Sequence, residues 1–200
     1  MKTGRSITIR LGVESVKKII LSFIFFFLLS TFHLPPSVGL PAEDVRVVAN
    51  EQYFKVAQDL IKGAKHSIRV MMFEMAYYKP HASTPTNVLI RELINGRKRG
   101  VKVEVILEVR EGEDRTTERN RQTGKILSEG GVDVIYDSPS KTTHTKVMII
   151  DEQLTLLGST NWTYSALTSN NEVAVLIRSK EVAKELIGYF NKVKTTGSKK

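Results

Sequence analysis

The chain has no cysteine among its 200 residues, and it is poor in tryptophan and proline, with one and six residues respectively. Without cysteine there is no disulfide, no thiolate ligand for a metal and no cysteine nucleophile, so a folded domain must rely on its apolar core alone. Neither a repeat nor a low-complexity tract is present. The length and the hydrophobic content of 41% suffice for one globular domain plus a short appendage.

The N-terminal segment has the layout of an export signal. Five Lys and Arg residues precede an apolar run over residues 19–34, which is shorter than the roughly 20 apolar residues of a spanning helix. Ser37 and Gly39 supply small residues before a cleavage site, so we expect a signal peptide over 1–39, a mature chain from Leu40 and an exported protein, periplasmic or extracellular. The alternative is an uncleaved membrane anchor that holds the domain outside the cytoplasm through residues 19–34.

Acidic residues are scarcer than basic ones, since 21 Asp and Glu face 30 Lys and Arg, for a formal net charge of +9. The first 39 residues hold five of these basic residues and one acidic residue, which leaves +5 for residues 40–200. A modest positive field suits a polyanionic partner such as nucleic acid or an anionic lipid surface. On charge alone, a basic but unspecialised surface is an equally open alternative.

Strand and helix patterns alternate along the rest of the chain. Continuous or alternating apolar residues predict strands at 45–50, 67–78, 101–109, 132–137, 146–151, 153–159 and 171–178. Helical spacing predicts helices at 51–64, 86–100, 115–131 and 180–193, the third with an almost wholly polar first half. This order predicts one α/β domain over 40–193, a sandwich whose mixed sheet is flanked by helices on both faces. We expect a loose basic tail over 194–200.

One predicted strand pair, HTKVMIIDEQLTLLGSTN over 144–161, carries polar residues within an apolar run. His144 and Lys146 are two residues apart, so they point to the same face of a strand. Ser159 and Asn161 are also two apart, at the end of the following strand. The two pairs are therefore expected to converge on one pocket.

Glu172 opens the next predicted strand and adds a carboxylate to this set. The combination suits the handling of a phosphate. Lys146, Ser159 and Asn161 would bind the nonbridging oxygens, where charge must be held during displacement at phosphorus. His144 can attack phosphorus if its other ring nitrogen donates to a carboxylate.

The spacing H-x-K-x4-D-x6-G-S-x-N resembles the HKD motif of the phospholipase D superfamily. The residues that carry it are His144, Lys146, Asp151, Gly158, Ser159 and Asn161. The N-N-E sequence ending at Glu172 is similar to the family's pattern, in which a carboxylate after the motif contacts a catalytic histidine. Within the superfamily the chain most resembles the small exported bacterial endonucleases with one motif. The mitochondrial cardiolipin hydrolase and piRNA nuclease group is similar in size and also has an N-terminal hydrophobic segment.

Larger phospholipases D hold two such motifs in one chain, whereas this chain holds one. Its four histidines are His33, His66, His81 and His144, and no second H-x-K follows the N-terminal segment. One protomer would therefore contain half of an active site. The resemblance implies that a symmetric homodimer completes it.

The resemblance further implies a phosphodiesterase that needs neither metal nor other cofactor. His144 of one protomer would form a phosphohistidine, and its copy in the other would protonate the leaving oxygen and then activate water. Lys146 and Asn161 would bind the phosphate with support from Ser159, and Glu172 would orient an imidazole of either protomer.

Asp151 belongs to the motif and is therefore a candidate catalytic residue. Its position at a strand end nevertheless suits structural hydrogen bonding better than direct chemistry. Arg110, between Glu108 and Glu111, would either reach a phosphate or join a solvated ion-pair cluster.

Three functions remain open at this point. The first is a nuclease that cleaves DNA or RNA, and the second is a phospholipid hydrolase anchored at a membrane. The third is a nucleic-acid-binding module without catalysis, with which the intact set of reactive residues is hard to reconcile.

Overall fold

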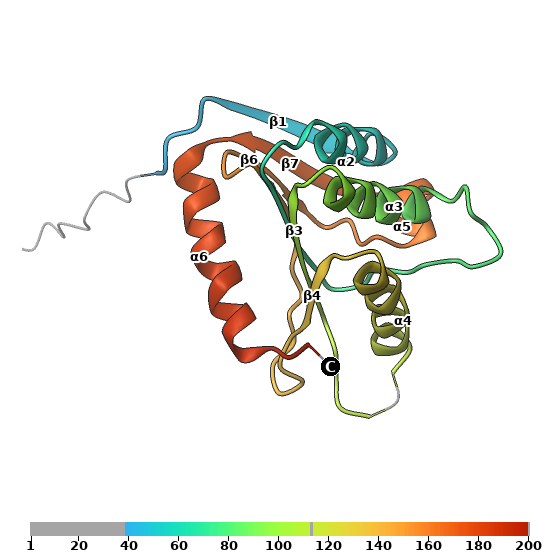
Figure 1. Ribbon diagram of the computed structural model, residues 1–200. Coiled ribbons are helices and arrows are strands. Elements are labelled where there is room, and N and C mark those ends of the chain that lie inside the picture. The colour runs from blue at the N-terminus through green and yellow to red at the C-terminus, as the bar shows by residue number, and fades with distance from the viewer. Residues whose placement is uncertain (1–38, 113, 200) are drawn as a thin grey trace, which may run out of the picture. The chain divides into compact units, whose positions relative to one another are not determined.

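A seven-stranded sheet forms the centre of the part of the chain that the computed structural model describes, residues 39–112 and 114–199 (Figure 1). The strands are β1 (Asp44–Ala49), β2 (Ser67–Met72), β3 (Lys102–Leu107), β4 (Asp133–Tyr136), β5 (Lys146–Ile150), β6 (Leu154–Gly158) and β7 (Val173–Arg178). Their order across the sheet is β1-β7-β6-β5-β2-β3-β4. β2, β3 and β4 pair in parallel and the other neighbours are antiparallel, so the predicted mixed sheet is confirmed.

Helices cover both faces of this sheet, as the alternating pattern predicted. They are α2 (Gln52–Gly63), α3 (Pro85–Lys98), α4 (Arg115–Glu129), α5 (Tyr164–Thr168) and α6 (Lys180–Thr196). The first four lie on one face, and α6 lies alone on the other (Figure 1). None of the helices within the described ranges combines the length and apolar character needed to cross a membrane. The predicted export segment falls outside the described residues except for Gly39.

Each face of the sheet buries its own apolar core, because neighbouring residues of a strand point to opposite sides. Under α6 the core contains Met71, Ile106, Ile135, Val147, Ile149, Ala183 and Phe190. The larger core, under the other four helices, includes Val70, Val105 and Met148 from the same strands. Strands β2, β3 and β5 therefore contribute buried residues to both cores.

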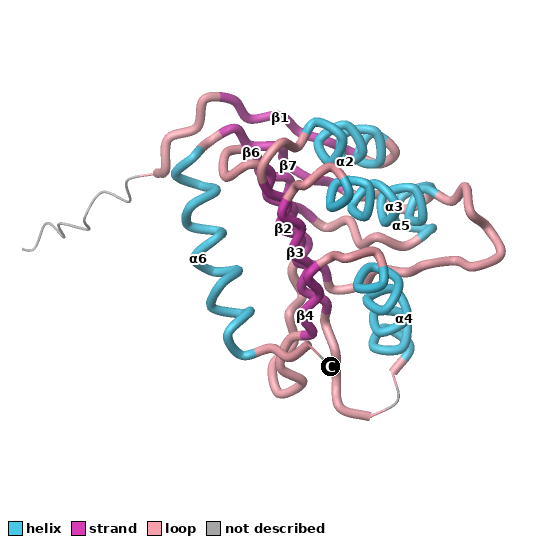
Figure 2. The backbone as a smooth tube through the Cα atoms, in the orientation of Figure 1, coloured by secondary structure: helices cyan, strands magenta, loops and turns pink. Residues whose placement is uncertain are grey.

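The strand predicted over 67–78 is shorter than expected, since β2 ends at Met72. The apolar character continues because the following segment is buried, although it leaves the sheet. Side chains of the neighbouring helices take over its hydrogen bonds: Met75 N donates to Asn120 Oδ1 (2.8 Å), and Tyr77 N donates to Thr123 Oγ1 (3.0 Å). This pairing explains why α4 has polar residues on its buried side. Figure 2 shows the long loop that follows.

The end of the chain differs from the loose tail predicted for 194–200. Helix α6 continues to Thr196, and Lys194 Nζ bonds to Glu104 Oε1 on β3. Ser198 then pairs with Tyr136 of β4 through two backbone hydrogen bonds of 2.7 Å. The basic residues at this end are thus held by acidic partners on the sheet, which the local sequence does not reveal.

Part of the face that carries α6 remains uncovered. We call it the open sheet face, and it consists of Val45, Val47, Val173, Val175 and Ile177 on β1 and β7. Cross-strand register places these side chains together, with Val45 opposite Ile177 and Val47 opposite Val175. Val45, Val47 and Val173 are 59%, 65% and 53% exposed. An apolar strip of this kind at a sheet edge is typical of a contact surface.

Candidate active site

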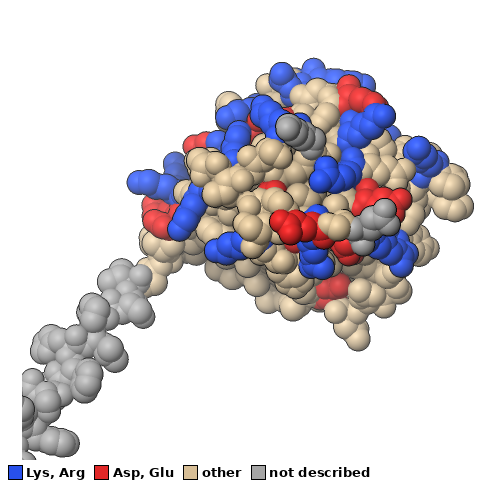
Figure 3. Space-filling model, turned by 90° about the horizontal axis from the view of Figure 1, so that it is seen from below, with Lys and Arg blue, Asp and Glu red and all other residues tan. Residues whose placement is uncertain are grey.

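The polar residues of the motif gather at one end of the sheet, where β2 and β3 finish and β5 begins. Phe73 follows β2 directly, and its N donates to Thr145 O (2.9 Å), which places the segment before β5 beside it. Figure 3 shows the face of the molecule seen from below the view of Figure 1, on which Lys and Arg side chains are interspersed with Asp and Glu. On this face the basic side chains are scattered among acidic ones rather than gathered in one large patch.

His144 and Lys146 are in direct contact, with 3.1 Å between His144 Nε2 and Lys146 Nζ. His144 lies just before β5 rather than within it, since β5 begins at Lys146. Both side chains contact the ring of Phe73, whose centroid is 4.5 Å from that of His144 and 4.8 Å from Lys146 Nζ. His144 and Lys146 therefore lie together, as their two-residue spacing predicted, and both side chains lie against the ring of Phe73.

Burial lowers the pKa of His144, and the positive charges of Lys146 and Arg110 lower it further. The lowered pKa favours the neutral imidazole, and this is the form that can attack phosphorus. Burial also lowers the pKa of Lys146, while the negative charges of Glu172 and Glu74 partly offset the effect.

Ser159 and Glu172 form the other side of the site. Ser159 Oγ donates to Glu172 Oε2, and Ser159 N donates to the carbonyl of Val173 (3.0 Å). The second oxygen of Glu172 accepts from Asn170 Nδ2 (3.1 Å). The structure therefore places Glu172 at the site and joins it to Ser159, not to His144 of the same chain. Among the described residues, no carboxylate hydrogen-bonds to His144.

Asn161 lies between this pair and the end of β2. The next residue, Trp162, donates from its N to Glu74 O (3.0 Å), which ties the segment to the strand end beside His144. The Oδ1 atom of Asn161 is buried and has no hydrogen-bond partner among the described residues. A buried polar atom left without a partner at such a position is available to a ligand.

Asp151 is not part of this cluster, which corrects its place among the candidate catalytic residues. It follows the far end of β5, and its carboxylate accepts hydrogen bonds from the backbone N atoms of Lys65 (2.9 Å), His66 (2.8 Å) and Ser67 (2.8 Å). Burial alone would raise its pKa, but these bonds outweigh burial and hold the pKa below its usual value. Asp151 thus fixes the start of β2 to the end of β5.

Several residues around the site were not predicted, because they come from distant parts of the chain. Phe73 and Glu74 follow β2, and Arg119 on α4 pairs with Glu74. No motif marks these three residues in the sequence. The sequence feature that could have identified them is their position, directly after a buried strand or on the helix that packs above it.

Arg110, left open between two roles, is positioned by Glu108. Glu108 is fully buried, and its Oε1 accepts from Arg110 Nε (3.2 Å) while its Oε2 accepts from Thr143 N (2.6 Å). Burial raises the pKa of Glu108, the Thr143 bond opposes this, and the adjacent carboxyl group of Asp137 raises it again. Glu108 therefore connects Arg110 with the loop that carries His144.

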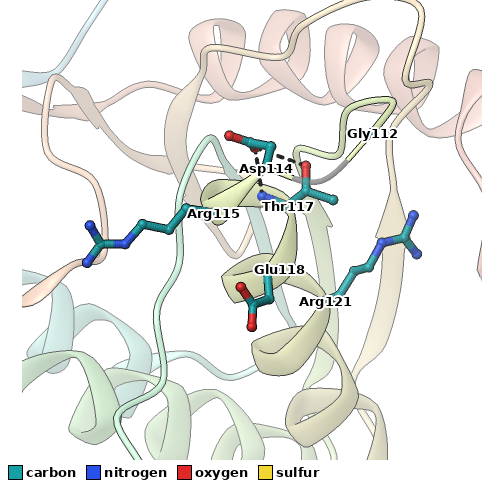
Figure 4. A pocket seen from close by; sticks show the side chains of 6 residues that line it. All are labelled: Gly112, Asp114, Arg115, Thr117, Glu118 and Arg121. Atoms are coloured by element: carbon teal, nitrogen blue, oxygen red, sulfur yellow. Dashed lines mark hydrogen bonds between the residues drawn. The ribbon is translucent and has the colours of Figure 1, made fainter.

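Two further observations limit what this end of the molecule can bind. In the described part of the chain, no three His, Asp or Glu side chains gather so as to hold a metal ion. A groove of about 580 Å³ lies at the start of α4, lined by Gly112, Asp114, Arg115, Thr117, Glu118 and Arg121. Its arginines Arg115 and Arg121 extend to opposite sides, and Asp114 caps the helix by accepting from Thr117 (Figure 4). The two arginines of this groove therefore do not point toward one common position where an anion could bind.

Known proteins resemble the chain over most of the domain. Residues 58–194 match a family model described as "Cardiolipin synthase, PLD-like domain". A phospholipase D of Rickettsia prowazekii (strain Madrid E) is 29% identical over 126 residues, 62% of this chain and 58% of that protein. A mitochondrial cardiolipin hydrolase of Canis lupus familiaris is 25% identical over 130 residues, 65% of this chain and 46% of that protein. The chain thus spans about half the length of the curated relatives it matches.

A solved structure shares the fold. Nuc from Salmonella typhimurium, a phospholipase D family member, superposes with a TM-score of 0.66 at 24% identity, covering 77% of this chain and 95% of that chain. The predicted α/β sandwich of this type is confirmed. With the family match and the geometry of the HKD residues, this shows that the chain belongs to the phospholipase D superfamily.

Proposed function

We propose that the protein is a phosphodiesterase that cleaves nucleic acid without a metal ion, through a phosphohistidine, in an active site shared by two copies of the chain. The observation that carries the proposal is the contact of 3.1 Å between His144 Nε2 and Lys146 Nζ. A nucleophilic nitrogen and a cation so close together can act on one phosphate group. The cation takes the place that a divalent ion has in other phosphoryl-transfer sites.

The reaction proceeds by two displacements at phosphorus. A ring nitrogen of His144 forms a bond to phosphorus as the bond to the leaving oxygen breaks, and the imidazolium of His144 in the second copy gives that oxygen its proton. The second imidazole, now neutral, takes a proton from water as the water oxygen attacks phosphorus and the P–N bond breaks. Lys146, Ser159 and Asn161 hold the nonbridging oxygens throughout.

Two observations support a homodimer. The HKD motif with His144 occurs once in the chain, so the two imidazoles of the proposed mechanism need two copies. The open sheet face provides a contact surface, and it begins at Val173, directly after Glu172. A second copy packed on this apolar strip lies beside the site, where Glu172 and the two His144 side chains can meet.

Nucleic acid is the favoured substrate because residues 40–200 carry a net charge of +5 and because the chain resembles small single-motif endonucleases. Phospholipid is the second candidate. It is favoured by the names of the relatives, a phospholipase D and a cardiolipin hydrolase. An uncleaved segment over 19–34 would hold such an enzyme at its substrate.

The test is one activity panel on the full chain in excess chelator. Single-stranded DNA, RNA and vesicles containing cardiolipin are offered in parallel to the wild type, to His144→Ala and to His66→Ala. His66 lies at the opposite end of the sheet and serves as the matched control. We expect cleavage of DNA or RNA in chelator, retained in His66→Ala and reduced at least about a thousandfold in His144→Ala.

The other outcomes discriminate among the candidates. Turnover of lipid without cleavage of nucleic acid replaces the proposal by the second candidate. Salt-dependent DNA binding without cleavage of any substrate indicates a binding module. Activity that disappears in chelator contradicts the metal-independent mechanism.

A further inference from the structure

We propose that Arg110 binds a second phosphate of the substrate, adjacent to the phosphate that reacts at His144 and Lys146. This inference rests on the proposed function, since it assigns a substrate contact within the same site. It predicts that the enzyme prefers chains of phosphodiesters, such as single-stranded nucleic acid, over a molecule with one phosphate.

The ring of Phe73 brings the three side chains together. Its centroid lies 5.1 Å from Arg110 Cζ, 4.8 Å from Lys146 Nζ and 4.5 Å from the ring centroid of His144. The positive charge of Arg110 is also one of the causes of the lowered pKa of His144, so Arg110 acts electrostatically on the imidazole. Arg110 is therefore a member of the reaction site rather than of a separate surface cluster.

Arg110 is held in a way that leaves donors available. Its Nε is fixed by Glu108 Oε1, and its side chain is 40% exposed. The terminal amino groups make no hydrogen bond to another described residue. A guanidinium anchored through Nε presents two parallel N–H groups, the arrangement that binds phosphate oxygens in pairs. Arg119, the nearby arginine on α4, is instead paired with Glu74.

The spacing of the strands favours a second phosphate over the reacting one. Lys146 stands on β5 and Arg110 follows β3, and β2 lies between these strands. Two strand spacings amount to about 10 Å. Side chains that start from backbones this far apart and both reach Phe73 can each hold one of two consecutive phosphates of a polynucleotide.

The experiment compares two substrates for the full-length protein: a single-stranded DNA oligonucleotide and bis(p-nitrophenyl) phosphate, which has one phosphate. Arg110→Ala is expected to lower kcat/KM for the oligonucleotide about tenfold, mainly through KM, because one charge-assisted contact is lost. Its kcat/KM for bis(p-nitrophenyl) phosphate should fall less than that for the oligonucleotide, because this substrate has no second phosphate for Arg110 to bind. The slope of log KM against log salt for the oligonucleotide should decrease by about 0.7.

Two variants keep the result interpretable. Arg110→Lys retains the charge and should recover part of the oligonucleotide activity. Arg178→Ala removes an exposed arginine at the far end of β7 and should change neither substrate preference nor the salt slope. Equal losses on both substrates in a folded Arg110→Ala protein would place Arg110 at the reacting phosphate and overturn the inference. Unchanged activity on both would also overturn it.

Failure of the proposed function gives a different pattern. If the wild type cleaves no nucleic acid, both proposals fall together. If the wild type cleaves both substrates and Arg110→Ala is indistinguishable from it, only the second-phosphate site is wrong.

Discussion

Asp151 shows that a residue of a catalytic motif can serve the fold instead of the chemistry. Its backbone φ of 50° lies in the left-handed region, which aspartate and asparagine tolerate better than most residues. In this conformation its carboxylate reaches three successive backbone N–H groups at the start of β2. The motif position is thus explained by geometry at the end of the sheet remote from His144.

We therefore predict that Asp151→Asn lowers stability and leaves the catalytic rate of the folded protein unchanged. Asparagine keeps the backbone conformation but loses one acceptor oxygen and the charge, a loss of about 1–3 kcal/mol in the free energy of unfolding. Denaturant unfolding and kcat measure the two effects. Glu152→Gln changes the neighbouring exposed carboxylate and should cost less than about 1 kcal/mol. A large fall in kcat at unchanged stability would contradict this prediction and indicate that Asp151 has a catalytic role.

At the scale of elements, α6 is joined to the sheet by an ion network as well as by its apolar face. Lys194 in its last turn bonds to Glu104 on β3 and to Asp133 on β4. Burial alone would raise the pKa of Glu104, but hydrogen bonds from Lys194 and Lys102 outweigh it and leave the pKa below its usual value. Glu104 is 2% exposed, so these partners are needed to offset the free-energy cost of burying its charge.

Removing one partner tests this network. Lys194→Ala should lower the free energy of unfolding by about 1–3 kcal/mol at neutral pH, and Lys102→Ala, whose side chain is 65% exposed, should lower it less. Because the folded pKa of Glu104 is depressed, its stabilising contribution is complete above the unfolded carboxyl pKa. That contribution is lost as pH falls through the folded value.

Urea unfolding of the wild type and of Lys194→Ala across the acidic range measures this dependence. The two stability curves should approach each other as the pH decreases. A difference that stays constant into strong acid would show that Lys194 contributes packing and not charge.

For the whole molecule, the proposed mechanism uses two imidazoles, whereas the chain has one HKD motif. We propose that a second copy packs on the open sheet face, whose exposed valines end next to Glu172. A substitution there tests assembly without touching the reacting groups.

We expect Val47→Asp to shift the protein from dimer toward monomer and to reduce activity in parallel, because a buried carboxylate in an apolar contact is costly. Arg46→Asp changes the adjacent residue, on the opposite face of β1, and should leave both properties unchanged. Sedimentation over a range of concentrations gives the assembly state, and cleavage assays at the same concentrations give the activity. A monomeric Val47→Asp protein with full activity would contradict the shared site.

The sequence by itself predicted the mixed α/β sandwich and the proximity of His144 to Lys146, and the structure shows both. Two residues that are two positions apart in a strand lie on the same face of the sheet, whatever packs against that sheet. The helix predicted over 115–131 is present as α4 in spite of its polar first half, because helical spacing is a local property. Residues close in the chain could thus be placed before any tertiary contact was known.

Only the tertiary structure decided the rest. Phe73, Arg110 and Glu108 reach His144 because β3 pairs with β2 and β2 with β5, and those pairings join residues far apart in the chain. The docked end of the chain depends in the same way on acidic residues of β3 and β4. Asp151 is the reverse case, a residue near His144 in the chain that a five-residue strand carries to the other end of the sheet. Sequence spacing fixes the direction of a side chain, whereas strand pairing fixes its neighbours.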